Sequence, residues 1–277
     1  MFQSDLLKGK RILVTGGGTG LGKSMGRRVL ELGARLVICG RRENVLEETK
    51  GAFDTDFPGR TRAISCDLRD PQQVEALVAA IWEEGPLDAL VNNAAGNFLA
   101  RSETLSPRAL DAVLAIVLHG TAYVTLACGR RWLAEDKKGN VLSIVATYAE
   151  TGSPYVVPSA MAKAGVLAMT RSLAVEWGGR GIRLNAIAPG PFPTEGAWQR
   201  LVPNEAMDRA WMNKIPLGRV GEHRELADLA AFLLADGSAY INGEVVTIDG
   251  GEWLKGAGQF SIMENLTEDD WAAMRKR

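Results

Sequence analysis

Short apolar runs rich in Val, Ile and Leu alternate along the chain with longer stretches that have helical spacing. Such runs are typical of strands buried in a parallel sheet. Glycine, proline or small polar residues follow most of the runs. The pattern predicts strands at 11–15, 34–39, 61–65, 87–91, 141–145, 182–188 and 244–248, and helices at 20–32, 106–135, 159–177 and 224–235.

Five strands alternate with helices before residue 182 without a domain-like linker, which predicts an α/β protein with a doubly wound parallel sheet, a Rossmann fold. We expect one catalytic domain at 1–253, with a small helical substrate flap at 192–221. The tail at 254–277 is expected to pack on this domain or on a neighbouring subunit. Ligands of such sheets bind at the carboxyl ends of the strands.

Glycines gather where the first predicted strand meets the first helix, in the stretch TGGGTGLG at 15–22. Backbone N–H groups and the positive end of a helix dipole can face a phosphate there, and glycine lets it approach. The alternative is a flexible turn. The position between a strand and a helix favours a nucleotide site, formed by Thr15, Gly16, Gly18, Thr19, Gly20 and Leu21.

The second predicted strand ends at Gly40, Arg41 and Arg42, and no acid occurs before Glu43. An acid at this place usually holds the ribose 2′-hydroxyl of NAD, whereas arginine suits the 2′-phosphate of NADP. Solvated surface arginines are the alternative. The sequence therefore predicts NADP(H), with Arg41 and Arg42 near its phosphate.

Two further strand ends complete the predicted cofactor site. Asp67, followed by Leu68, stands where a carboxylate could meet the adenine edge, although it could also cap the next helix. Small residues after the fourth strand let a cofactor lie against the backbone, and Asn97 projects a hydrogen-bond donor beyond them. Asn93 comes first in this segment, and the small residues Ala94, Ala95 and Gly96 follow it.

Composition narrows the class of protein. Lys and Arg total 32 against 33 Asp and Glu, so the charge of −1 indicates no nucleic-acid partner. Three isolated cysteines fit a reducing cytosol, the first residues lack the apolar core of a signal peptide, and no continuous apolar run approaches the length of a membrane span. We expect a soluble cytoplasmic protein.

The stretch at 144–163, IVATYAETGSPYVVPSAMAK, carries the candidate chemistry. A lysine near a nicotinamide, with a phenol beside it, moves a proton in one common class of enzyme. Tyr148 precedes Lys163 by fifteen residues and Ser159 by eleven. That spacing to Lys163 is too long for one helix face, so Tyr148 is expected on the loop before the helix.

With these motifs the chain resembles the short-chain dehydrogenase/reductase superfamily over essentially its whole length. In that superfamily the tyrosine usually lies four residues before the lysine. Here the usual serine, tyrosine and helix asparagine positions hold Ala146, Ser159 and His119, and only Lys163 matches. Ala146 and Ser159 disfavour a ketone or alcohol reductase, and His119, a lone histidine on a helix, favours a structural role.

Within the superfamily, the segments NNAAGNF (92–98), TYAETGS (147–153), VVPSAMAKAG (156–165) and GPFPTEGAWQRL (190–201) resemble the mitochondrial-type 2,4-dienoyl-CoA reductases. The resemblance implies NADPH-dependent reduction of 2,4-dienoyl-CoA to 3-enoyl-CoA in unsaturated fatty acid β-oxidation, by a homotetramer. A trans-2-enoyl-CoA reductase, another short-chain oxidoreductase and a catalytically silent NADP(H)-binding protein are the alternatives.

The same resemblance implies roles for individual residues. Tyr148 would be the acid, Asn97 the donor to the thioester oxygen, Lys163 the ligand of the nicotinamide ribose, and Ser159 a further hydrogen-bonding group. Arg41 would meet the 2′-phosphate and Asp67 the adenine. The acyl-CoA side would be formed by Arg69, Phe98, Ser106 and Arg200, and the segment beside the nicotinamide by Pro189, Gly190, Pro191 and Phe192. No metal is implied.

Overall fold

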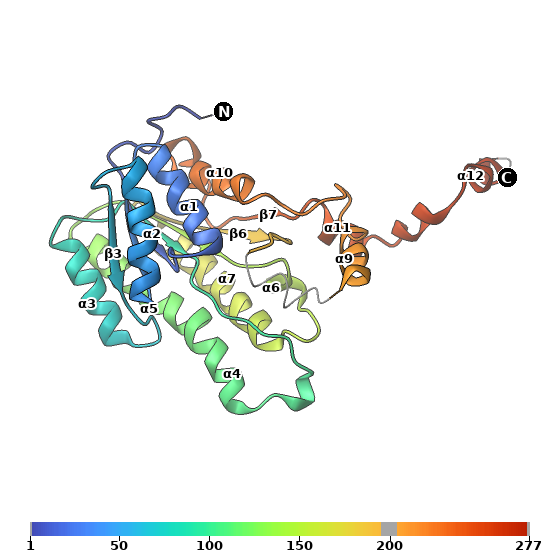
Figure 1. Ribbon diagram of the computed structural model, residues 1–277, viewed down its shortest axis with the longest axis horizontal. Coiled ribbons are helices and arrows are strands. Elements are labelled where there is room, and N and C mark those ends of the chain that lie inside the picture. Colours follow the sequence, from blue (N-terminus) through green and yellow to red (C-terminus); the bar gives the residue numbers. More distant parts are fainter. Residues whose placement is uncertain (1, 195–203, 276–277) are drawn as a thin grey trace.

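A computed structural model describes residues 2–194 and 204–275. Its centre is a seven-stranded sheet in which every neighbouring pair is parallel, in the order β3-β2-β1-β4-β5-β6-β7 (Figure 1). This is the predicted doubly wound fold. The strands are β1 (Arg11–Thr15), β2 (Arg35–Gly40), β3 (Thr61–Ser65), β4 (Ala89–Asn92), β5 (Gly139–Ile144), β6 (Ile182–Pro189) and β7 (Val245–Ile248).

Helices cover both faces of the sheet. On one face α1 (Gly20–Glu31), α2 (Glu43–Asp56) and α10 (His223–Leu234) share one hydrophobic cluster with the strands. On the other face α3 (Pro71–Trp82), α5 (Gly120–Ala134) and α7 (Val157–Gly178) share a second cluster, with Trp132 fully buried. The strands between them are apolar on both sides, which explains why their sequences are continuous rather than alternating.

The predicted strand limits are correct within two residues. β4 begins at Ala89 instead of residue 87. Just before the strand, the indole N–H of Trp132 donates to the carbonyl oxygen of Leu87 at 2.6 Å. Differences of this size are ordinary at element ends.

The predicted helix at 106–135 contains an irregularity that the periodicity does not show. It comprises α4 (Pro107–Leu114), a π-helical turn, η2 (Ala115–His119), and α5. Gly120 follows the π-turn, and a Cβ there would lie 2.9 Å from the Cβ of Leu68, so glycine permits this close packing. His119 is exposed at the end of the π-turn.

The stretch Pro107–Ala134 is also long and apolar enough to cross a membrane, judged by length and composition alone. Polar residues interrupt this stretch, so it contains no continuous apolar run of that length. Half of its most apolar window is buried inside the domain. Val117, Val124 and Trp132 pack into the clusters beneath the sheet, so we interpret it as a core helix.

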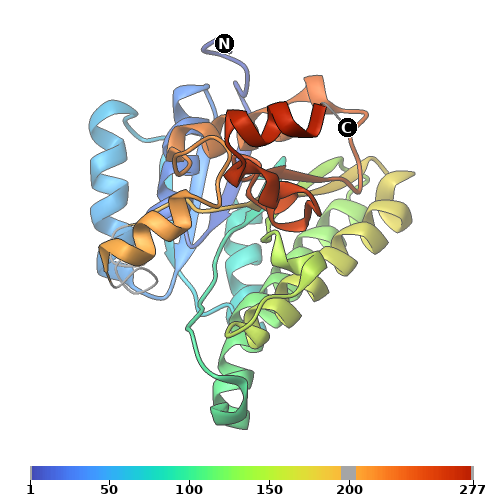
Figure 2. The ribbon, with the colours of Figure 1, turned by 90° about the vertical axis from the view of Figure 1, so that its right-hand side faces the viewer.

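Beyond β6 the chain leaves the alternating pattern. The part of the predicted flap that contains Arg200 lies outside the described residues, and α9 (Glu205–Met212) is the helix of that flap within the described residues. After β7 come α11 (Glu252–Ala257), η4 (Ser261–Asn265) and α12 (Glu268–Arg275). Residues 258–275, which we call the arm, run away from the domain in Figure 1 and face the viewer in Figure 2.

The remaining short elements are single turns at loop ends: η1 (Ser102–Thr104), η3 (Asp236–Ser238) and α6 (Tyr148–Thr151). Tyr148 is therefore the first residue of a four-residue helix rather than part of an irregular loop. The correction is small, because this turn still lies between β5 and α7, as expected.

Candidate active site

The glycine turn after β1 forms a cradle that only glycine can line. Gly16 and Gly20 have positive φ angles of 65° and 53°. A Cβ on Gly22 would lie 2.4 Å from the carbonyl oxygen of Gly16, and one on Gly16 would lie 3.0 Å from the Cα of Ala94. Side chains would therefore fill the space between the turn and the backbone after β4.

The first turn of α1 retains free backbone donors. Thr19 precedes the helix, but its side chain does not cap it, and no acidic residue stands in the first turn. Uncapped N–H groups and the helix dipole together attract a phosphate. The geometry of the cradle suits the diphosphate of a dinucleotide, the ligand predicted for Gly18, Gly20 and Leu21.

Thr15 and Asn93 tie this turn to the end of β4. The hydroxyl of Thr15 accepts hydrogen bonds from the backbone N–H groups of Asn93 and Ala94, both at 3.0 Å. The amide of Asn93 donates to the carbonyl oxygen of Thr15 at 3.0 Å. Both residues thus shape the cradle from behind, whereas Ala95 and Gly96 are exposed.

The ends of β2 and β3 carry the charged part of the site. Arg41 and Arg42 are exposed, and the charge of Arg41 contributes to lowering the pKa of Asp67. The main cause of that lowered pKa is Arg69, whose guanidinium donates to the Asp67 carboxylate at 2.5–3.0 Å. The structure thus pairs Arg69 with Asp67, next to buried Leu68.

Lys163 lies on α7 at the carboxyl ends of β5 and β6. Its Nζ donates to the carbonyl oxygen of Ile144 at 2.5 Å. The side chain is buried, and loss of hydration lowers its pKa from 10.5 to about 8. A lysine held by β5 in this way keeps a fixed place at the strand end.

Tyr148 and Ser159 meet at the same place from two helices. The phenol oxygen of Tyr148, on α6, is 3.1 Å from the hydroxyl oxygen of Ser159, on α7. Ser159 is buried and Tyr148 is half-buried, so the phenol remains accessible from the site. The fold therefore brings Tyr148 into hydrogen-bonding contact with Ser159, which stands four residues before Lys163.

Asn97 stands on the exposed segment after β4. Its side-chain oxygen accepts from the backbone N–H of Phe98 at 2.9 Å, which leaves the two amide hydrogens for other acceptors, and the residue is exposed. No acceptor among the described residues takes them. Phe98 is 38% exposed beside it. Ser106, by contrast, caps α4 by accepting from the N–H of Ala109.

Family comparison identifies the domain. The family model described as enoyl-(acyl carrier protein) reductase matches residues 16–252. The chain belongs to the short-chain dehydrogenase/reductase family. Its catalytic end departs from the common pattern of that family at Ala146, Ser159 and His119, as the sequence indicates.

Named relatives of this short-chain dehydrogenase/reductase include proteins called 2,4-dienoyl-CoA reductases. A probable 2,4-dienoyl-CoA reductase [(2E)-enoyl-CoA-producing] from Bacillus subtilis is 46% identical, covering 88% of this chain and 97% of that protein. Probable 2,4-dienoyl-CoA reductase 3 [(3E)-enoyl-CoA-producing] from Caenorhabditis elegans is 42% identical, covering 98% and 90%. A short-chain dehydrogenase structure from Bacillus anthracis has a TM-score of 0.81 at 43% identity, covering 88% and 96%.

The segment after β6 borders the candidate site in this short-chain dehydrogenase/reductase. Gly190 donates its N–H to the carbonyl oxygen of Ile248, at 2.9 Å, and a Cβ on it would lie 2.7 Å from Asp249. Pro189 is the last residue of β6, and Pro191 and Phe192 follow it without regular secondary structure. This places them at the carboxyl edge of the sheet together with Lys163.

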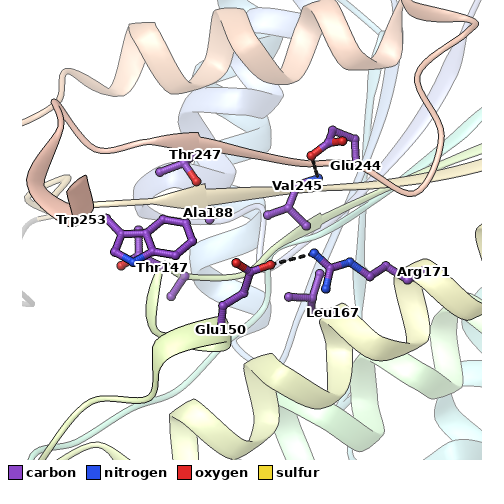
Figure 3. Close-up of a pocket in the computed structure, with 10 residues that line it drawn as sticks. Thr147, Glu150, Leu167, Arg171, Ala188, Glu244, Val245, Thr247 and Trp253 are labelled. Carbon is purple, nitrogen blue, oxygen red and sulfur yellow. Dashed lines mark hydrogen bonds and ion pairs between the residues drawn. The ribbon is translucent and has the colours of Figure 1, made fainter. Parts of the chain in front are cut away.

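A small pocket behind α6 contains residues that the sequence does not single out (Figure 3). Glu150, on α6, accepts from Arg171 on α7 at 2.7 Å, and Thr147 and Trp253 lie on the other side. The pair joins α6 to α7 and so fixes the turn that carries Tyr148. Its partners are 21 residues apart, and their spacing carries no signal of this contact.

Proposed function

We propose that this protein reduces 2,4-dienoyl-CoA thioesters to 3-enoyl-CoA with NADPH. The observation that carries the proposal is the 3.1 Å contact between Tyr148 and Ser159, beside buried Lys163. A carbonyl reductase with Ala146 and Ser159 at the common positions would lack its usual acid. Relatives named as dienoyl-CoA reductases support the same reaction type.

The reaction needs charge to move through the substrate. When bound, the reduced nicotinamide supplies a hydride for the δ-carbon. Negative charge then develops on the thioester oxygen, where the amide N–H groups of exposed Asn97 are suited to stabilise it. Tyr148 gives its proton to the α-carbon, which leaves the double bond between carbons 3 and 4. The cationic form of Lys163 favours departure of that proton.

For the cofactor, the proposal of NADPH rests on Arg41. It is exposed at the end of β2, beside the cradle, where an acid would be expected for NAD. Arg42 adds a second positive charge. The ion pair between Arg69 and Asp67 orients the carboxylate near the place proposed for adenine, and we now assign Arg69 to that side in preference to the acyl-CoA side.

The relative from Bacillus subtilis supports a second candidate product, because its name specifies (2E)-enoyl-CoA. Protonation at the γ-carbon instead of the α-carbon would give it. The choice depends on which carbon lies nearest the phenol of Tyr148. We favour the α-carbon, because Asn97 and Tyr148 both serve the thioester end of the substrate.

The experiment that tests the reaction follows NADPH absorbance with 2,4-hexadienoyl-CoA, 2,4-decadienoyl-CoA, crotonyl-CoA and a panel of ketones. We expect oxidation with the two dienoyl thioesters only, and a product with its double bond at carbon 3 by NMR. Turnover of crotonyl-CoA would identify a 2-enoyl-CoA reductase. NADPH binding without any turnover would identify a silent binding protein.

For the assembly, we propose a cytoplasmic homotetramer that acts in β-oxidation and in which the arm contacts a second copy of the chain. Phe260 and Ile262 are 73% and 70% exposed on the arm. On the domain, Tyr240, Val175 and Leu217 also leave apolar surface uncovered. The free thiols of all three cysteines are consistent with the proposed compartment.

A further inference from the structure

A histidine joins the cofactor cradle to the segment that follows β6. His223, the first residue of α10, lies half-buried between α1 and residues 191–194, which we call the strap. Its Nδ1 is 2.9 Å from the hydroxyl oxygen of Ser24, and its Nε2 is 2.7 Å from the carbonyl oxygen of Pro193. The partners are 199 and 30 residues distant, so only the fold brings them together.

The carbonyl oxygen of Pro193 determines that Nε2 of the His223 ring carries a hydrogen. A carbonyl oxygen only accepts, so Nε2 carries a hydrogen and donates it to Pro193. In the neutral ring Nδ1 then accepts from the hydroxyl of Ser24. Ser24 lies on α1 one turn after Gly20, next to the cradle. His223 is thereby connected to the start of α1 through Ser24.

The strap touches the same turn directly. The side chain of Thr194 lies over Gly20, 3.2 Å from the position that a Cβ would take. At the other end of the strap, the N–H of Gly221 donates to the carbonyl oxygen of Pro191 at 3.0 Å. Among the described residues, His223 is the one side chain that hydrogen-bonds to the strap. It therefore links the strap to α1 through a side chain, in addition to the direct contact of Thr194 with Gly20.

We propose that His223 is a positioning residue for the dinucleotide cofactor. It fixes the position of the strap relative to the glycine turn, and it acts through Ser24 and Pro193 rather than by contact with the reacting atoms. The proposal rests on the proposed use of a nicotinamide dinucleotide and is independent of the acyl substrate.

Substitution of His223 by glutamine or by asparagine tests the two hydrogen bonds of the ring separately. A glutamine amide nitrogen takes about the place of Nε2, whereas an asparagine amide takes about the place of Nδ1. His223→Gln keeps the donor to Pro193, and His223→Asn keeps only the contact with Ser24. We expect His223→Asn and His223→Ala to weaken NADPH binding about tenfold, the size of a lost neutral hydrogen bond, and His223→Gln to stay within about threefold of the wild type.

The coupling to Ser24 gives an internal check. Ser24→Ala alone should weaken NADPH binding by about two- to fivefold, because it loses one contact of the ring. Added to His223→Ala it should cause no further loss, since its effect passes through the ring. Full additivity of the two losses would contradict this connection.

The measurement is fluorescence titration of the unliganded enzyme with NADPH and, separately, NADH, together with melting temperatures. At saturating cofactor kcat should change little, while the cofactor KM follows the dissociation constant. Wild-type affinity in His223→Asn, or affinity in His223→Gln as weak as in His223→Ala, would overturn the proposal. A lower melting temperature with unchanged affinity would show a structural role only. No acyl thioester enters the titration, so failure of the proposed reaction would leave the result intact.

Discussion

Tyr148 and Ser159 present two hydroxyl groups to one point of the site, and only one of them can be the final acid. A phenol is a far stronger acid than an aliphatic alcohol. General acids contribute about 10²–10⁴-fold, so Tyr148→Phe should lower kcat by that factor. Ser159→Ala should lower it about tenfold, through one neutral hydrogen bond. Steady-state kinetics decides, with exposed Tyr240→Phe as the control; a crippled Ser159→Ala beside an active Tyr148→Phe would reverse the assignment.

Asn97 provides a separate test of charge stabilisation. Its amide hydrogens are the donors proposed for the thioester oxygen. Asn97→Ala should lower kcat by about 10²–10³-fold, as for other single oxyanion donors, while the dissociation constant of NADPH stays unchanged. Near-normal kcat with a raised KM for the thioester would mean that Asn97 only binds substrate.

Lys163 makes the stability of the unliganded protein depend on pH. Burial lowers its pKa from 10.5 to about 8, so between these values the unfolded chain binds more protons than the folded one. The contribution of Lys163 to the free energy of unfolding therefore rises with pH in this window, by at most about 1.4 kcal/mol per pH unit. Urea denaturation at pH 7, 8, 9 and 10 should show the rise in the wild type relative to Lys163→Met. Parallel curves for the two proteins would refute it.

Residue types and spacing predict much of the site, because Tyr148, Ser159 and Lys163 stand close together in the chain. The contact of Tyr148 with Ser159 follows from a loop that returns to the start of α7. The links made by His223 cannot be predicted in this way. Ser24 is 199 residues distant, and its meeting with His223 depends on how α1 packs against α10.

At the scale of elements, apolar runs predict all strands of the sheet because buried parallel strands have no polar face. The π-turn at Ala115–His119 is different, since one inserted residue leaves the apolar spacing of a long helix almost unchanged. The single-turn helix α6 is too short to show a period. Helix irregularities of this kind can be predicted only when the packing around them is known. Here that packing is the close approach of Gly120 to Leu68.

The end of β2 carries the prediction for the cofactor. Arg41→Ala should raise the KM for NADPH about 10- to 100-fold, equal to the 1.5–3 kcal/mol of about one lost charged hydrogen bond, and leave that for NADH nearly unchanged. Arg35→Ala is the matched control, because Arg35 is exposed at the opposite end of the same strand. Equal use of NADPH and NADH by the unmodified enzyme would exclude the role of Arg41.

At the scale of the whole molecule, the arm is the segment that extends beyond the family domain. The family model ends at residue 252, before the arm begins. Within the arm, α12 has eight residues, and Thr267 and Asp270 form a reciprocal cap at its start. A helix this short is not stable alone in water, even with a good cap, so it needs a surface to pack on.

That surface is proposed to belong to a second copy, because Phe260 and Ile262 remain 73% and 70% exposed on a single chain. Deletion of residues 258–277 should therefore give a smaller assembly in light scattering after size exclusion. The double substitution Phe260→Ser and Ile262→Ser in the full-length chain should act in the same direction, since it removes only apolar contacts. Glu268→Gln on the same arm is the control and should keep the full mass, because Glu268 is exposed and this change removes no apolar contact. An unchanged mass in both the deletion and the double substitution would show that the arm does not hold the assembly together.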